Sequence, residues 1–249
     1  MRITFLFIIA CLLFLIVSIT VVSCKKEPIN IPGRIAGYVS LYDENNSLIE
    51  NMSGVIVTIE SMPSFNATTD IYGKFVIDNV PSGTFNIDFT KQGFSETKQT
   101  GFSFVAEKGA YMLSKILCKP STTTVKLVSL SIDSANHQFG MIVLECYSHT
   151  LSKNSAIARV FYGLSNSISY SNYDYSLSMS PDDISSTNDS IMVGIGFSPY
   201  NYCSSGTKVF VIAYGAPSNY SSYINTNTGK TIYPGLNPTP SQIMSIVLP

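Results

Sequence analysis

The sequence TTDIYGKFVIDNVPSGTFNIDFTKQGF, residues 68–94, decides the fold because turn residues and alternating strands follow one another in it. Asp70 and Gly73 occupy the first and fourth positions of a β-turn, where Asp can bond to the backbone ahead and Gly tolerates a positive φ. A hairpin-like reversal is predicted here. The sequence NVPSG at 79–83 then breaks the chain a second time.

Two half-buried strands are predicted around these turns. Residues 74–78 and 84–90 alternate between apolar and polar side chains, as expected of antiparallel strands with one face on a core. The apolar residues that would share the inner face are Phe75, Ile77, Phe85, Ile87 and Phe89.

The spacing of these residues resembles that of a known family. TDxxGxF at 69–75 and VPxGxFxI at 80–87, with GYV at 37–39 and GVIV at 54–57, are similar to the carboxypeptidase regulatory-like domain. The resemblance covers residues 34–118 and implies a small transthyretin-like β-sandwich that accompanies catalytic, receptor or adhesive domains. One departure is that NMS at 51–53 stands where the family often has a Pro.

Composition sets the class of the whole chain. Its 249 residues allow one or two domains. The 15 Tyr and 14 Phe, with no apolar period of 3.6 residues after residue 24, favour an all-β fold of antiparallel β-sandwiches. The net charge of -1, without a basic run, argues against nucleic-acid binding, which needs clustered Lys and Arg.

Residues 1–23 are predicted to be an export signal, with Arg2 as a minimal basic region before an apolar run. An apolar run of about 20 residues could also span a bilayer as an uncleaved anchor. The sequence VVSC at 21–24 resembles a bacterial lipobox, and KKE at 25–27 resembles the mature start of many Bacteroidetes lipoproteins. The resemblance implies that Cys24 carries a lipid anchor, that residues 24–33 form a tether, and that the protein lies at the outer membrane, on its periplasmic face or the cell surface.

Further strands are predicted on both sides of a linker over residues 119–124, which should bury little. The sequence GTKVFVIAY at 206–214 resembles the penultimate strand of a fibronectin type III-like domain, although Val209 stands where that family usually has Tyr. A second, fibronectin or immunoglobulin-like sandwich is therefore expected over residues 125–249. The other predicted strands are 35–42, 55–60, 102–105, 111–117, 125–132, 140–146, 157–162, 191–197, 208–214 and 242–248, with 169–179 as a further candidate.

Three cysteines remain if Cys24 is lipidated and the signal is removed, and the compartment is oxidising. Cys146 and Cys203 are the more plausible disulfide pair because both lie in the second half. Buried free thiols are the alternative. The absence of a Cys-x-x-Cys motif and the presence of two isolated His residues exclude a zinc site.

No enzyme motif is present, and no cofactor is expected. Cys146 and His149 would point to opposite faces of one strand, which argues against a thiol dyad. A divergent hydrolase is kept as a minor alternative, with paired carboxylates among Asp174, Asp182, Asp183 and Asp189.

Tyrosines in polar connections are the candidate binding residues, because Tyr offers a flat apolar face and a hydroxyl at low entropic cost. The alternative is that they pack across strands on a sheet surface. The leading prediction is a non-catalytic accessory that binds glycan or protein, and the second is a spacer or assembly subunit that contacts other envelope proteins. The candidate ligand-binding residues are Tyr170, Tyr173, Tyr175, Tyr200 and Tyr202.

Overall fold

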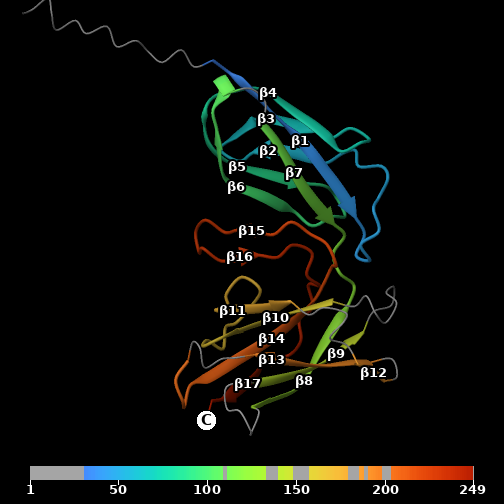
Figure 1. Ribbon diagram of the computed structural model, residues 1–249, viewed down its shortest axis with the longest axis vertical. Helices are drawn as coiled ribbons and strands as arrows, with labels where there is room; N and C mark the ends of the chain where they lie inside the picture. Colours follow the sequence, from blue (N-terminus) through green and yellow to red (C-terminus); the bar gives the residue numbers. More distant parts are fainter. Residues whose placement is uncertain are drawn as a thin grey trace, which may run out of the picture. The chain divides into compact units, whose positions relative to one another are not determined.

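The computed structural model describes residues 31–108, 111–132, 140–147, 157–178, 185–187, 190–197 and 203–248 (Figure 1). Regular structure in this part of the chain is all β apart from the short 3₁₀-helix η1 (Ala106–Lys108), which confirms the predicted all-β sandwich class. No helix in the described part is long and apolar enough to cross a membrane. Cys24, the predicted site of lipidation, and the predicted signal lie outside the described residues.

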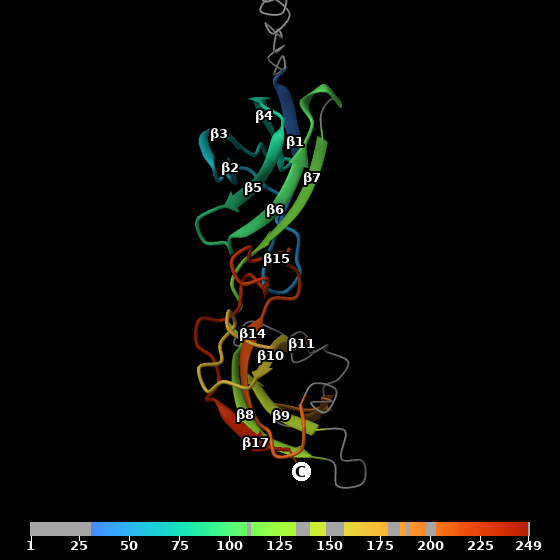
Figure 2. The same cartoon turned by 90° about the vertical axis from the view of Figure 1, so that its left-hand side faces the viewer.

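Two sheets form the first sandwich (Figure 2). One sheet has the order β4 (Lys74–Val80), β1 (Gly33–Tyr42), β7 (Tyr111–Cys118). The other has the order β3 (Met62–Thr68), β2 (Ile56–Ile59), β5 (Gly83–Thr90), β6 (Thr97–Phe104). The predicted inner faces are confirmed, since Phe75, Ile77, Ile87 and Phe89 are buried in one hydrophobic core and Phe85 packs against it.

The predicted turn at 70–73 forms, but it does not make a hairpin. Asp70 Oδ1 accepts hydrogen bonds from the backbone N–H groups of Tyr72 and Lys74, both at 2.9 Å. Gly73 adopts a φ of 76°, as the turn residue pattern predicts. The strands on its two sides, β3 and β4, belong to different sheets, so the chain turns a corner between the layers of the sandwich.

One strand pair departs from the predicted antiparallel arrangement. β1 and β7 pair in parallel, from Ile35 opposite Tyr111 to Tyr42 opposite Cys118. Parallel neighbours need a long crossover between them. Here the crossover consists of the five strands β2 to β6, which are divided between the two sheets. Strand β3 was not predicted, and it lies at the edge of its sheet. Pro63 is tolerated there because an edge strand does not need every backbone N–H as a donor.

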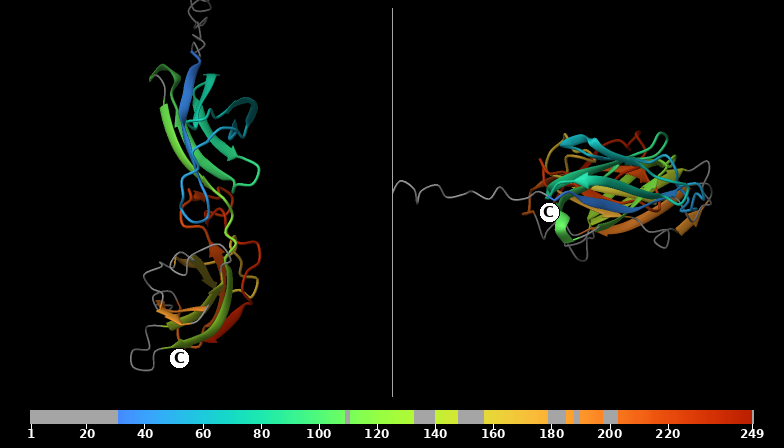
Figure 3. Two further views of the ribbon diagram at one scale, coloured as in Figure 1. Left: turned by 90° about the vertical axis from the view of Figure 1, so that its right-hand side faces the viewer. Right: turned by 90° about the horizontal axis from the view of Figure 1, so that it is seen from above.

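Two four-stranded sheets form the second sandwich, whose layers can be followed in Figure 3. Their order corresponds to the two sheets of immunoglobulin-like sandwiches. Val209 is buried in the core between them. The first sheet is β11 (Tyr175–Ser178), β10 (Ile157–Gly163), β14 (Lys208–Ala216), β17 (Met244–Val247), and the second is β12 (Ser185–Thr187), β13 (Ser190–Phe197), β9 (Gly140–Tyr147), β8 (Thr124–Ile132).

The sheet of β10 and β14 is buried on both faces. Val160 and Val211 face the core between the sheets, whereas Phe161, Ile212 and Tyr214 form a separate apolar cluster on the opposite face. Residues 164–174 and the connection between β14 and β17 cover that cluster through Ile168, Tyr173, Tyr233 and Leu236. This β14–β17 connection, residues 217–243, contains the hairpin of β15 (Tyr223–Ile224) and β16 (Thr231–Ile232).

The segment 119–124 is more buried than predicted. Ser121 and Thr123 are buried, and the β14–β17 connection supplies their hydrogen-bond partners. Ser121 N–H donates to the Gly235 carbonyl (2.8 Å), and the Asn237 amide donates to the Thr123 carbonyl (2.9 Å). The expectation that this segment buries little was wrong, because its partners lie more than 100 residues away in sequence. The chain divides into the units Met1–Ile31 and Pro32–Pro249, so the domain boundary at this segment stays a prediction.

Candidate ligand-binding sites

Tyr173 is positioned by packing. Its ring lies 4.8 Å from that of Phe161, it is 8% exposed, and its hydroxyl donates to the Thr231 carbonyl at 2.8 Å. Burial raises the pKa of its hydroxyl, and the nearby Tyr233 raises it further. Tyr173 therefore packs on the sheet surface from the loop before β11, and its ring is not available to a ligand.

Tyr175 lies on the other face of the sheet. Its ring stacks on that of Tyr162 with centroids 5.3 Å apart, and both rings belong to the apolar core region between the sheets. Tyr175 also lines a hollow at the edge of that core. The structure thus separates the predicted residues Tyr170, Tyr173 and Tyr175. Tyr200 and Tyr202 lie outside the described residues.

Tyr170 is the exposed member of the three, with 47% of its surface accessible. Its ring meets that of Tyr214 at 87°, with centroids 5.9 Å apart. Together with residues 232–238 and Pro240, these two tyrosines line a groove of about 450 Å³. We call this the tyrosine groove. Its lining residues, none of them charged, are Tyr170, Tyr214, Ile232, Tyr233, Pro234, Gly235, Leu236, Asn237, Pro238 and Pro240.

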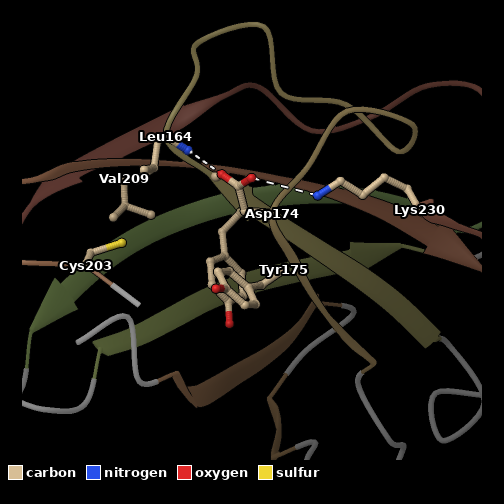
Figure 4. A pocket seen from close by; sticks show the side chains of 8 residues that line it. Leu164, Asp174, Tyr175, Cys203, Val209 and Lys230 are labelled. Carbon is tan, nitrogen blue, oxygen red and sulfur yellow. Dashed lines mark hydrogen bonds and ion pairs between the residues drawn. The ribbon is translucent and has the colours of Figure 1, made fainter. Parts of the chain in front are cut away.

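The second hollow carries both signs of charge and has a volume of about 280 Å³. We call it the charged hollow. Figure 4 shows the Asp174 carboxylate between the Leu164 N–H and the Lys230 ammonium. Leu164 N–H donates to Asp174 Oδ2 at 3.0 Å, and Asp174 Oδ1 lies 3.9 Å from Lys230 Nζ. The remaining lining residues are Tyr162, Gly163, Tyr175, Cys203 and Val209.

The predicted disulfide is absent. Cys118, Cys146 and Cys203 are free thiols. Cys146 lies on β9, whereas Cys203 lies in the chain before β14 and lines the charged hollow. Burial raises the pKa of Cys118 to about 11 and that of Cys146 to about 12. Burial, and then the charge of Asp174, raise the pKa of Cys203. A raised pKa disfavours the thiolate, so none of the three resembles an activated nucleophile.

The residues considered for catalysis or metal binding are only partly covered by the structure. His149, Asp182, Asp183 and Asp189 lie outside the described residues. Among the residues that line the charged hollow, Asp174 is the one carboxylate, and it faces an ammonium group instead of a second acid. Within the described part of the chain, no group of three or more His, Cys, Asp or Glu residues could hold a metal ion.

Sequence reasoning missed most of the groove and one end of the charged hollow. Lys230 and residues 232–240 come from the β14–β17 connection, and none of them was predicted to line a site. The sequence YPGLNPTP at 233–240 carried a signal, because three prolines close behind a Tyr predict an extended segment with an aromatic neighbour. Nothing in the sequence indicated that this segment folds back over β14.

No family model and no curated protein matches this chain, so the carboxypeptidase regulatory-like resemblance is not confirmed. Solved structures are similar only in fold. A DUF3823 family protein from Bacteroides ovatus is 7% identical over 88% of this chain and 100% of its own, with a TM-score of 0.34. A Bacteroides uniformis protein, provisionally named as carbohydrate binding, is 10% identical over 88% and 100%, with a TM-score of 0.29.

A type II cohesin–X–dockerin complex from Acetivibrio cellulolyticus includes a chain that is 20% identical. The similarity covers 36% of this chain and 59% of that one, with a TM-score of 0.31. This protein therefore spans less than two thirds of that chain. None of these similarities is close enough to identify a ligand.

Proposed function

We propose that this protein is a lipid-anchored, non-catalytic accessory of the bacterial cell envelope that binds carbohydrate through the tyrosine groove. The observation that carries the proposal is the half-exposed ring of Tyr170 on the wall of an uncharged groove. An exposed Tyr ring offers an apolar face on which the C–H groups of a sugar can pack. The perpendicular ring of Tyr214 fixes the position of the Tyr170 ring.

The rest of the groove suits a neutral sugar. Pro234, Pro238 and Pro240 have no backbone N–H, so this wall has few backbone donors to offer a ligand. The side chain of Asn237 is already engaged, since its amide donates to the Thr123 carbonyl and its oxygen accepts from Thr239 N–H. A ligand with many hydroxyl donors and an apolar ring face complements such a wall.

The lipid anchor at Cys24 would keep this site at the membrane. One acyl chain anchors a protein only marginally, whereas two or more anchor it stably. We expect Cys24→Ser to abolish metabolic labelling by a fatty acid and to release the protein from the membrane fraction. Retention of the variant in the membrane would favour an uncleaved transmembrane anchor instead.

The test of carbohydrate binding is a glycan panel probed with residues 25–249. We expect binding of a neutral glycan, with a loss of about tenfold or more in Tyr170→Ala, as for an aromatic residue at the centre of a site. Tyr72→Ala is the matched control, because Tyr72 is 75% exposed in the turn of the first sandwich. Binding to no glycan, or equal loss in both variants, would contradict the proposal.

An assembly role is the second candidate, and strand β17 favours it. β17 is the last strand in the order of its sheet, with Val247 57% exposed and the adjacent Ile243 44% exposed. An apolar edge strand can pair with the edge of a second copy. Sedimentation velocity should then show a dimer that Val247→Lys disrupts. If the protein is a monomer at all concentrations, pairing of two copies through β17 is excluded and carbohydrate binding remains the proposed function.

A further inference from the structure

Two opposite charges face one another in the charged hollow without forming a close pair. Asp174 directly precedes β11, whereas Lys230 directly precedes β16. Their nearest charged atoms are 3.9 Å apart, which exceeds the 2.7–2.9 Å of a charge-assisted hydrogen bond. The carboxylate and the ammonium group therefore keep hydrogen-bonding capacity for a third partner.

The carboxylate is held in place by the backbone. Leu164 N–H binds Oδ2 and leaves Oδ1 facing Lys230. Gly163 makes room for this arrangement, because a Cβ at that position would lie 2.9 Å from Asp174 Oδ2. Lys230 Nζ also lies 5.6 Å from the centre of the Tyr173 ring, within the range of a cation–π contact. Both charged groups thus have fixed surroundings.

The remaining lining of the hollow is mostly apolar. Figure 4 shows Val209 and Cys203 to the left of Asp174 and the ring of Tyr175 below it. A volume of about 280 Å³ lies just below the usual range of about 300–1,000 Å³ for ligand pockets, so the hollow fits a small molecule. Such a ligand would carry its charges at one end and an apolar part at the other.

We propose that the charged hollow binds the head group of a free α-amino acid. The ligand's ammonium group donates to Asp174 Oδ1, and its carboxylate accepts from Lys230 Nζ. The two charges of an amino acid are close together, as are those of Asp174 and Lys230. Each charge of the ligand can therefore face the opposite charge of the protein. The ligand's side chain lies against Val209 and Tyr175. A neutral sugar would bring no charge to either group, so charge complementarity favours the amino acid.

The experiment is calorimetric titration of residues 25–249 with glycine, alanine, valine and leucine, together with their N-acetyl and methyl ester derivatives. We expect binding of at least one free amino acid, and a loss of about tenfold or more when either charge of the ligand is blocked. Affinity should fall as salt is raised, because the pair is partly exposed. Failure of all four amino acids to bind, or equal binding of the blocked derivatives, would overturn the proposal.

Variants locate the site. Asp174→Asn and Lys230→Met should each weaken binding about tenfold or more, whereas Lys74→Met, on the exposed face of β4, should not. Gly163→Ala should weaken binding by displacing the carboxylate without changing any charge. Circular dichroism of each variant separates loss of the site from loss of the fold. Unchanged binding in both charge variants would place the amino acid elsewhere and overturn the assignment.

Amino-acid binding in the charged hollow is independent of the tyrosine groove. Tyr170→Ala should leave amino-acid binding unchanged, and Asp174→Asn should leave neutral-glycan binding unchanged. If a neutral monosaccharide displaces the bound amino acid, the charged hollow is a sugar site and the amino-acid assignment is wrong. The two binding reactions can therefore fail separately.

Discussion

The two sandwiches differ in how many faces of their sheets are buried. In the first sandwich, apolar residues of β2 such as Val57 and Ile59 face one core. An outer surface of the same sandwich carries the ion pairs of Lys98 with Glu60 and Asp88, at 3.3 and 3.0 Å. In the second sandwich, β10 and β14 bury apolar residues on both faces. The second face needs a cover, and loops of the chain provide it.

The cover has a functional consequence. The β14–β17 connection that buries Phe161 and Tyr214 also supplies Lys230 to the charged hollow and residues 232–240 to the tyrosine groove. Sheet surfaces are flat, whereas loops packed on a sheet leave hollows between them. Both candidate sites therefore lie where loops pack against the doubly buried sheet.

The largest expected effect is a loss of stability at high pH in both sandwiches. Cys118 and Cys146 have folded-state pKa values raised to about 11 and about 12, from an unfolded value of 9.0. Each thiol must stay neutral to remain buried, so its stabilisation is complete below pH 9 and is lost as pH rises through the folded pKa. The upper limits are about 3 kcal/mol for Cys118 and about 4 kcal/mol for Cys146.

Urea unfolding between pH 8 and 11 measures this loss. Cys118→Ala, in the first sandwich, should make the free energy of unfolding depend less steeply on pH. Cys146→Ala, in the second sandwich, should have the same effect. Because other groups also titrate in this range, the comparison with the wild-type slope is the decisive quantity. An unchanged slope in both variants would mean that neither thiol resists ionisation.

Phe161→Ala should be nearly as damaging. The ring of Phe161 is fully buried and contacts the rings of Tyr173, Tyr214 and Tyr233, so its removal leaves a cavity under the loops. We expect a cost of about 3–5 kcal/mol in the free energy of unfolding. Ile56→Ala, on the outer face of β2 with Ile56 50% exposed, should cost about 0.5 kcal/mol or less. If chemical denaturation gives similar costs for Phe161→Ala and Ile56→Ala, the outer face of the second sandwich is not more buried than that of the first.

A smaller loss of stability is expected when Gly73 or Gly93, which lie in two turns of the first sandwich, is replaced by Ala. Gly73 and Gly93 have φ values of 76° and 80°. A Cβ at Gly73 would lie 2.1 Å from the Val39 carbonyl oxygen, whereas a Cβ at Gly93 would meet no atom within 4 Å. Gly93→Ala should cost about 1–2 kcal/mol for the left-handed backbone, and Gly73→Ala about 1–3 kcal/mol more for the clash. Thermal unfolding of the two variants tests this order.

Local sequence patterns were sufficient to predict the positions of most strands of both sandwiches. The alternation around Phe75 and Phe89 predicted their inner faces, because a half-buried strand repeats every two residues. The same rule does not describe β14, where KVFVIAYGA is almost continuously apolar. Such a run predicts a strand covered on both faces but gives no information on which segment covers it. The predicted strand at 169–179 was too long, because the chain before β11 forms part of that cover.

The sequence by itself determined the all-β class, the turn at Asp70 and Gly73, and the inner faces of the strands, because each depends on neighbours within a few residues. Only the tertiary structure decided which tyrosines are accessible. Tyr170 and Tyr173 stand three residues apart in equally polar sequence, yet one lines a groove and the other is buried under Lys230. That difference depends on the β14–β17 connection, which lies about 50 residues further along the chain.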